Sequence, residues 1–492
     1  MLSISIFLVS IILVFLAYLD TKKPNNFPPG PKWFPIIGSA WQLHKLQQKK
    51  SLIVKVSEEL ALKYGPLVGV RIGCTRIVFV YGLRATQEFL TRDDFIGRPD
   101  SIFFTSRTWG KRRGIIFVDS EFWREQKQFF LKQMSFRKEN IAYSIEKEVK
   151  GITNNLKKSI EDGNGEAVFQ MGDLFGISIL NVLWTLMVGD EYAKDEKEMK
   201  AIAIIVKDLF GNSLVVGGLF GHFPFLRYIC PNYCGYNEYV NINGMLTNFI
   251  KKTVEKMKTN YNSNTTRGFI DSYLHVLNSE EKAESFSEDQ LVAIGLDLLF
   301  AGYETTSKTV SLAFLFMLLH PDIQKKAQDE IDQIVGRDRL PTLEDRRLLH
   351  YIEAISLETT RLFTGHILNS PRRAVKDCYF NGYFIPKGTT LAVNFRGVSL
   401  NTESGWEDPK IFNPERFIKN GKLTIPNNYM AFGLGKRRCL GESLAKAHMF
   451  LIFASLLQTF NFEAIPNDPP IAEIREAFIP CVRPFRGKIT LR

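Results

Sequence analysis

One cysteine near the C-terminus lies in a run of residues that strongly constrains what this chain can fold into. Residues 432–441 read FGLGKRRCLG and fit the spaced pattern Phe-x-x-Gly-x-Arg-x-Cys-x-Gly. At average residue usage, a chain of 492 residues would match this pattern by chance roughly once in 10⁴ sequences. A helix-forming stretch follows Cys439, so we expect N–H groups at its start to favour a negatively charged thiolate. Gly433 and Gly435 favour a tight turn before it.

For any cysteine taken alone, a buried free thiol is the more common explanation. This run, however, resembles the cysteine loop of the cytochrome P-450 family, and the resemblance extends from about Pro28 to the C-terminus. It implies that the Cys439 thiolate is the axial ligand of a haem iron. It also implies that Phe432 shields the sulfur, that Arg437 pairs with a haem propionate, and that Gly441 lets the backbone approach the porphyrin.

A second segment matches another motif of the same family. Glu358 and Arg361 lie three residues apart, a spacing at which side chains meet on one face of a helix, although such a pair alone would be an ordinary surface ion pair. Arg416 follows in the run Pro-Glu-Arg-Phe at the family's usual distance before the cysteine. The resemblance therefore implies that Glu358, Arg361 and Arg416 form a structural triad behind the haem.

A long apolar stretch in the second half of the chain contains a recognisable helix start. Ser287 followed three residues later by Gln290 is the pattern of a capping box. We therefore predict one helix from Glu288 to His320, which at about 1.5 Å per residue is roughly 50 Å long. A helix of that length crosses a whole domain and is buried.

Inside this stretch, residues 301–306 read AGYETT, which places an acid and two hydroxyl groups in a buried helix. Such groups are costly to bury unless they are hydrogen-bonded, and a threonine often bonds the carbonyl one turn earlier. The run also matches the oxygen-binding motif of the P-450 family. The resemblance implies that Gly302 and Thr305 open a groove for dioxygen, and that Glu304 and Thr305 are the catalytic residues that organise water for proton delivery.

We predict a mainly α fold with small β-sheets (α+β) that forms one catalytic domain. Of the 492 residues, 45% are hydrophobic and 12% aromatic, so the chain can bury a large core. We found no linker, repeat or low-complexity tract in the sequence that would divide it. We expect a membrane anchor over 1–20, a proline-rich hinge over 21–35 and a haem-thiolate domain over 36–492. Alternating β-branched residues predict two strands between 68 and 80 and another small sheet between 379 and 393.

The N-terminal segment predicts a membrane location. Residues 2–19 form an uncharged stretch rich in Leu, Ile, Val and Phe, which nearly spans a bilayer as a transmembrane helix. It has neither a preceding cationic segment nor a small-residue cleavage site, so a cleaved secretory signal is the less favoured interpretation. Lys22 and Lys23 just after it favour a cytosolic catalytic domain. The next run, FPPGP, resembles the proline hinge of microsomal P-450s, which implies the endoplasmic reticulum membrane.

The net charge of +11 is compatible with several kinds of partner. Nucleic acid is rejected, because the basic residues form no dense run interleaved with aromatic residues. The resemblance instead implies an NADPH-dependent flavoprotein reductase, with cytochrome b5 as a further candidate, docking on the cysteine side of the haem. The basic residues expected on that surface are Arg124, Lys127, Lys132, Lys436, Arg438 and Lys446.

The resemblance implies further cofactor and substrate contacts. Trp123 and Lys127 match a Trp-x-x-x-Arg motif that contacts a haem propionate, but the lysine here lacks the planar fork of arginine. Arg372 matches another propionate-binding position. Each residue expected in the substrate pocket is also compatible with an ordinary core position. These residues are Phe103, Phe104, Phe220, Phe300, Ala301, Ile367 and Phe478.

Together these features predict a haem-thiolate monooxygenase that inserts one atom of O₂ into an apolar substrate by hydroxylation or epoxidation. We expect haem b as cofactor and electrons from NADPH through the reductase. The hinge and cysteine-loop sequences resemble insect microsomal members, including the methyl farnesoate epoxidase group. Epoxidation of a sesquiterpenoid juvenile-hormone precursor is therefore the substrate hypothesis.

Three alternatives stay open. The substrate of the same reaction class is a steroid, an ecdysteroid or a xenobiotic. Alternatively, the protein rearranges peroxides, although family members that do so usually lack the acid–threonine pair. A different class of function is non-catalytic, haem-dependent binding of a hormone or a gas.

Overall fold

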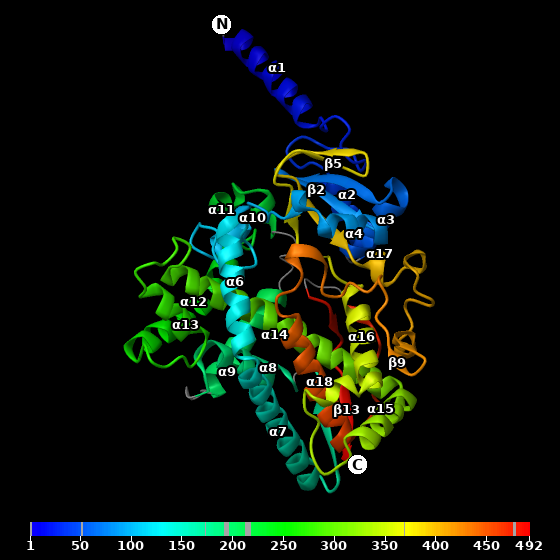
Figure 1. The fold of residues 1–492 in the computed structure, drawn as a ribbon. Coiled ribbons are helices and arrows are strands. Elements are labelled where there is room, and N and C mark those ends of the chain that lie inside the picture. The colour runs from blue at the N-terminus through cyan, green and yellow to red at the C-terminus, as the bar shows by residue number, and fades with distance from the viewer. Residues whose placement is uncertain are drawn as a thin grey trace.

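The computed structural model describes residues 2–50, 53–172, 174–190, 196–211, 218–368, 370–475 and 479–492. Helices dominate these residues and the sheets are small, so the predicted fold class is confirmed. Figure 1 shows most of the helices gathered in the lower part of the molecule and the larger sheet above them.

The longest helix of the described residues, α14 (Glu288–Leu319), runs through the middle of the molecule (Figure 1). The predicted cap at its start is confirmed, because Ser287 Oγ accepts a hydrogen bond from the Gln290 N–H at 3.2 Å. The other half of the capping box is not formed. The Gln290 side chain instead bonds both backbone groups of Gly114, accepting from its N–H at 2.8 Å and donating to its carbonyl at 3.0 Å. The start of α14 is thereby fastened to a distant loop.

Helices α8, α12, α16 and α18 make the most extensive contacts with α14, and α9, α13 and α15 also pack against it. The buried side chains at these contacts form the main hydrophobic core, which includes Ile179, Phe314 and Phe450. The helix bounds are α1 Leu2–Asp20, α2 Ala40–Lys50, α3 Ile53–Tyr64, α4 Leu83–Thr91, α5 Ile102–Ser106, α6 Ser120–Phe136, α7 Lys138–Asp162, α8 Gly176–Val188, α9 Glu196–Gly211, α10 Gly218–His222, α11 Leu226–Ile229, α12 Tyr236–Thr259, α13 Phe269–Leu277, α15 Pro321–Ile334, α16 His350–Thr364, α17 Arg396–Ser399 and α18 Glu442–Thr459.

The larger sheet has the strand order β1-β2-β7-β4. The two strands predicted between 68 and 80 are confirmed as an antiparallel pair in which Leu67 faces Val80. The strand bounds are β1 Leu67–Ile72, β2 Thr75–Tyr81, β3 Glu166–Gln170, β4 Arg372–Arg373, β5 Cys378–Phe380, β6 Tyr383–Ile385, β7 Thr390–Asn394, β8 Ile418–Lys419, β9 Lys422–Leu423, β10 Phe460–Glu463, β11 Ile474–Arg475, β12 Cys481–Val482 and β13 Arg486–Leu491.

The prediction of a separate sheet between 379 and 393 is only half right. Strands β5 and β6 form a hairpin whose turn residues, Asn381 and Gly382, both have positive φ, as a two-residue turn of type I′ requires. Strand β7, however, pairs in parallel with β2 of the larger sheet. This pairing joins segments more than 300 residues apart, so local periodicity carries no sign of it.

Helix α1 projects away from the rest of the molecule (Figure 1), and its apolar side chains from Ile6 to Leu16 are exposed. No helix in the described ranges is both long and apolar enough to cross a membrane. The end of α1 is bonded to strand β1 of the larger sheet and to the segment before it. Arg71 donates to the two carboxylate oxygens of Asp20 at 2.6 Å and 2.7 Å, and the Ile36 N–H donates to the same carboxylate at 2.7 Å.

Candidate active site

A cavity of about 410 Å³ lies between α14 and the loop that precedes α18. Ala301, Gly302 and Thr305 line it from α14, and Phe432 and Cys439 line it from the loop. Two segments with separate sequence motifs therefore meet at one cavity, although Thr305 and Cys439 are 134 residues apart.

The loop around Cys439 has the predicted tight geometry. Gly433 and Gly435 have φ of 73° and 70°, and a side chain at Gly435 would collide with the carbonyl oxygen of Leu90. The Cys439 N–H donates to the Phe432 carbonyl at 3.0 Å, which closes the loop. The Cys439 side chain remains exposed within the cavity.

At Cys439 a backbone N–H favours the charged form of the sulfur, but burial acts more strongly in the opposite direction. Burial raises the pKa of the Cys439 thiol, and the Gly441 N–H lowers it by a smaller amount. The helix itself begins three residues later, at Glu442, so its N-terminus does not outweigh the loss of solvation. A bound metal cation would favour the ionised form of this sulfur.

Three arginines of interest line the cavity: Arg98 and Arg372 are buried, and Arg437 is half-buried. None of them lies within ion-pair distance of a carboxylate in the part of the chain that the structure describes. Their hydrogen bonds go to carbonyl oxygens and one hydroxyl, namely from Arg98 to Ser370 and Pro371, from Arg372 to Leu90 and Leu434, and from Arg437 to Ile96 and Val118.

Burial lowers the pKa of these guanidinium groups, to about 10 for Arg98, about 9 for Arg372 and about 8 for Arg437. Repulsion from Arg98 adds to the lowering at the other two. Burying several cations without counter-charges is unfavourable, so this end of the cavity is built for an anion. The two propionates of a haem, with Cys439 as ligand to its iron, fit this arrangement.

Sequence analysis did not identify Arg98 as a site residue. Its guanidinium partners Ser370 and Pro371 lie 272 and 273 residues away, so its place at the cavity depends on the folded loops. Its Nε is buried and has no hydrogen-bond partner among the described residues. A buried donor without an acceptor is the structural signal that marks it.

Trp123 and Lys127 lie near the same end of the cavity, but only Trp123 lines it. The Arg437 guanidinium lies 3.6 Å from the centroid of the Trp123 ring. The Lys127 ammonium donates to the Lys436 carbonyl at 2.7 Å. The structure directs this lysine to a backbone oxygen rather than into the cavity, and its propionate contact stays a prediction.

The two predicted catalytic residues lie on different sides of α14. The Thr305 hydroxyl lines the cavity and donates to the Ala301 carbonyl at 2.6 Å, the back-bonding that sequence analysis considered. Glu304 is buried and does not line the cavity, and its carboxylate lies 3.8 Å from the Lys308 ammonium. Only the hydroxyl of this pair faces the cavity directly.

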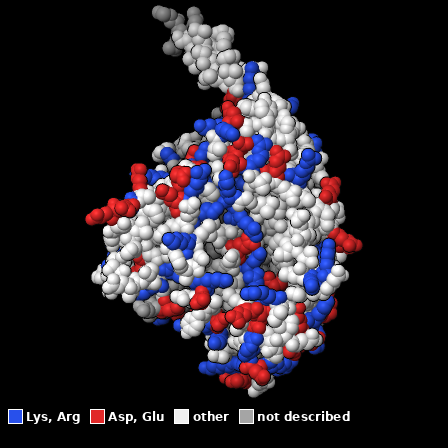
Figure 2. All heavy atoms as spheres, viewed as in Figure 1, with Lys and Arg blue, Asp and Glu red and all other residues white. Residues whose placement is uncertain are grey.

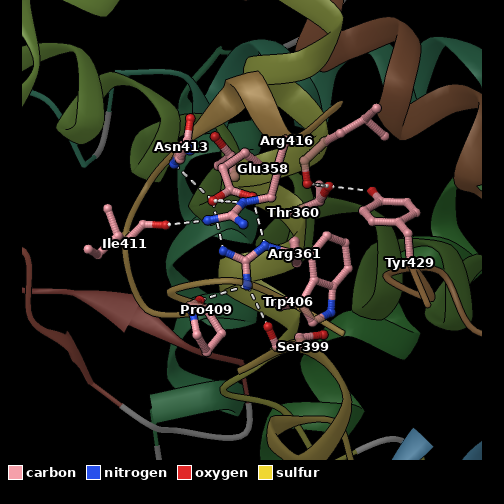
Figure 3. Close-up of polar contacts among 12 residues, drawn as sticks. Glu358, Thr360, Arg361, Ser399, Trp406, Pro409, Ile411, Asn413, Arg416 and Tyr429 are labelled. Atoms are coloured by element: carbon pink, nitrogen blue, oxygen red, sulfur yellow. Dashed lines mark hydrogen bonds and ion pairs between the residues drawn. The ribbon is translucent and has the colours of Figure 1, made fainter. Parts of the chain in front are cut away.

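The three predicted triad residues are in contact, as Figure 3 shows. Arg361 donates to both carboxylate oxygens of Glu358 at 2.7 Å, and Arg416 Nε donates to the same carboxylate at 3.1 Å. Glu358 and Arg361 are 0% and 1% exposed. The remaining nitrogen of Arg361, Nη1, donates to the carbonyls of both Ser399 and Pro409, so the triad joins α16 to the loop that leads toward Cys439.

The residues predicted for the substrate pocket fall into two groups. Ala301 and Ile367 line the cavity. Phe103, Phe104, Phe220 and Phe300 do not, because they pack into an aromatic cluster with Phe117 and Tyr239. Phe478 lies outside the described residues. The other apolar side chains lining the cavity include Ile115, Ile116, Leu183, Leu298 and Phe363.

Basic side chains gather on the face shown in Figure 2, where α6 and α18 also lie. Several of the predicted docking residues are already paired with acids. Lys436 bonds Asp93 at 2.7 Å, and Arg438 and Lys446 bond Glu442 at 2.5 Å and 2.7 Å. Their docking role stays a prediction.

Comparisons with known proteins give one family over nearly the whole chain. The model of the cytochrome P-450 family matches residues 28–484. The chain is 36% identical over 484 residues to probable cytochrome P-450 303a1 of Drosophila melanogaster, covering 96% of each chain. It is 31% identical over 469 residues to farnesoate epoxidase of Bombyx mori, covering 94% and 93%. It is 29% identical over 465 residues to cytochrome P-450 2J2 of Homo sapiens, covering 92% and 88%.

Proteins of this family use haem b iron and receive electrons from NADPH through a partner reductase. The cavity has what such a group requires, since a cysteine, a helix face and three arginines without acidic partners surround it. The motifs, the geometry and the comparisons agree that the chain belongs to the cytochrome P-450 family.

Proposed function

We propose that this protein is a monooxygenase that inserts one oxygen atom from O₂ into an apolar substrate, by hydroxylation or epoxidation. The observation that carries the proposal is that Cys439 and Thr305 line one cavity, together with three arginines that lack carboxylate partners. Bound haem would supply the oxygen-activating chemistry, and a thiolate ligand would contribute electron density to it.

The residues of the chain take the following roles. Cys439 provides the thiolate, and Arg98, Arg372 and Arg437 hold the carboxylates of the cofactor. Thr305 binds water at the cavity and passes a proton from it by exchanging its bond to the Ala301 carbonyl. Glu304 does not line the cavity, and its carboxylate keeps the neighbouring part of α14 polar.

We assign the apolar walls of the cavity to substrate. Ile115, Leu298 and Ile367 offer no charge to a ligand, so they select a hydrophobic molecule. The similarity to farnesoate epoxidase supports epoxidation of a sesquiterpenoid, and steroid or xenobiotic hydroxylation is the competing assignment.

We further propose that residues 1–20 hold the protein at the endoplasmic reticulum membrane, with residues 21–35 as the connection and residues 36–492 as a cytosolic catalytic domain. The exposed apolar side chains of α1 support this location, because water-exposed apolar side chains in a row mark contact with lipid or protein. The partner is an NADPH-dependent reductase, with cytochrome b5 as a second electron donor.

The decisive experiment is a product screen with purified protein, reductase, NADPH and ¹⁸O₂. Farnesoate esters and acids, steroids and xenobiotics form the panel, and mass spectrometry detects the label. We expect one labelled oxygen atom in the product of at least one class. Product formation without NADPH, or ligand that is bound but always released unchanged, would contradict the proposal.

Two variants test the assigned residues. Cys439→Ser should abolish the absorption band that carbon monoxide gives with thiolate-ligated ferrous haem.

Thr305→Ala should lower the yield of product per NADPH by about tenfold. The matched control is Thr259→Ala, which removes the same kind of back-bonded hydroxyl from the exposed end of α12. Unchanged coupling in Thr305→Ala would remove that residue from the mechanism.

A further inference from the structure

Behind the three cavity arginines lies a second group of charged residues centred on Asp119. Its carboxylate accepts the Arg98 N–H at 2.9 Å and Arg373 Nη2 at 2.8 Å. Both carboxylate oxygens also accept from Arg112, each at 3.0 Å. Asp119, Arg112 and Arg373 do not line the cavity, so they form an outer layer against Arg98.

This outer layer bonds both backbone polar groups of Arg98. Its N–H donates to Asp119, and its carbonyl accepts from Arg373 Nε at 2.8 Å and from Arg112 Nη2 at 3.2 Å. The far end of the Arg98 side chain is fixed by Ser370 and Pro371. Between the bonded backbone and the bonded end of the side chain lies the buried Nε of Arg98, which has no acceptor among the described residues.

Asp119 is also a negative charge close to Arg98. Burial raises the pKa of its carboxyl, but the bonds from the Arg98 N–H and from Arg112 outweigh burial and leave the pKa below its ordinary value. Burial lowers the pKa of Arg98, and the negative charges of Asp297 and Asp119 raise it by smaller amounts. Asp119 bonds the Arg98 backbone N–H, so it leaves the side-chain nitrogens of Arg98 without a carboxylate partner.

We infer that Asp119 is a positioning residue for the cofactor: from outside the cavity it fixes Arg98, so that the inner arginines bind the haem carboxylates. This inference rests on the proposed function, because it takes haem as the ligand. The simpler alternative is that Asp119 only braces the loop between residues 97 and 119. The two roles of Asp119 predict different results. If Asp119 only stabilises the loop, its loss weakens the binding of any ligand, whereas if it positions Arg98, its loss weakens the binding only of a ligand with carboxylates.

The test compares the rate at which holoprotein loses haem to excess apomyoglobin, using either haem or haem dimethyl ester, whose propionates are blocked. Asp119→Asn keeps the shape of the side chain and removes its charge. We expect haem to leave this variant at least about tenfold faster than wild type, the effect of losing charge-assisted hydrogen bonds. With the dimethyl ester, we expect wild type and variant to differ by less than about twofold.

The matched control is Asp100→Asn, which makes the same chemical change beside the same arginines. Asp100 lies 3.0 Å from Arg112 and 3.7 Å from Arg373, but its side chain is 58% exposed. Its variant should release haem at the wild-type rate, because solvent screens such a pair.

If Asp119→Asn does not fold, Arg112→Lys replaces it, because lysine keeps the charge and loses the two-point bond to Asp119. We expect faster loss of haem and no effect with the ester. Equal rates in variant and wild type, or an equal acceleration with the ester, would overturn the role of Asp119. Wild-type protein that binds no haem would contradict the proposed function itself, which is a separate result.

Discussion

At the scale of single residues, the triad of Figure 3 shows how one buried carboxylate holds two cations. In Glu358→Gln, Arg361 and Arg416 lose their counter-charge in a buried place. We expect a loss of about 3–5 kcal/mol in the free energy of unfolding, because the variant strands buried charge. Urea unfolding followed by far-UV circular dichroism measures it.

The control for this variant is Glu415→Gln, a residue adjacent to Arg416. Glu415 pairs with Lys326, and the two side chains are about half exposed, 49% and 56%. The same chemical change there should cost less than about 1 kcal/mol. Equal losses in the two variants would show that burial of the triad does not matter.

A second residue-scale prediction concerns pH. Burial lowers the pKa of His448 from 6.5 to about 4, so the unfolded chain binds a proton that the folded protein excludes. The associated stability is present above pH 6.5 and is lost as the pH falls toward 4, by at most about 1.4 kcal/mol per pH unit. In His448→Met this part of the acid sensitivity should disappear.

Thermal unfolding of wild type and His448→Met between pH 4 and pH 7 tests the prediction through the slope of stability against pH. The exposed His275 serves as control, and His275→Met should keep the wild-type slope. Parallel slopes for wild type and His448→Met would show that the pKa of His448 does not change on folding.

At the scale of elements, the start of α14 depends on one hydroxyl. Ser287→Ala removes the acceptor of the Gln290 N–H and should cost about 1 kcal/mol locally. Hydrogen exchange of the first-turn amides should become about fivefold faster, as peptide mass spectrometry would show. In Ser279→Ala, which lies in an exposed loop before α14, exchange in that turn should not change.

The same element shows what could be predicted from sequence. The helix start is encoded by neighbours in the chain, so Ser287 and the end near His320 were predicted to within one residue. The Gln290 side chain was not, because its partner Gly114 is 176 residues away. The pairing of β7 with β2, the place of Arg98 and the turning of Phe103 away from the cavity share this cause, because all three are decided by contacts that exist only after folding.

At the scale of the whole molecule, the proposed attachment to membranes depends on α1. Removing residues 1–20 should move the protein from the membrane pellet into the supernatant while the carbon monoxide spectrum is retained, since the cavity has no lining residue in that segment. Replacing Lys22 and Lys23 with Gln should leave the protein in the pellet. A truncated protein that still sediments with membranes would assign the attachment to another surface.

The forked ion pair between Asp20 and Arg71 has a mechanical consequence. If α1 were joined to the protein by a flexible segment alone, the globular part could take many orientations relative to a surface that binds α1. The two parallel hydrogen bonds between Arg71 and Asp20 restrict this angle. The Asp20 carboxylate would then contribute to the angle between α1 and the rest of the protein. Breaking the Asp20–Arg71 ion pair would leave the cavity intact and would change the orientation of the cavity relative to α1.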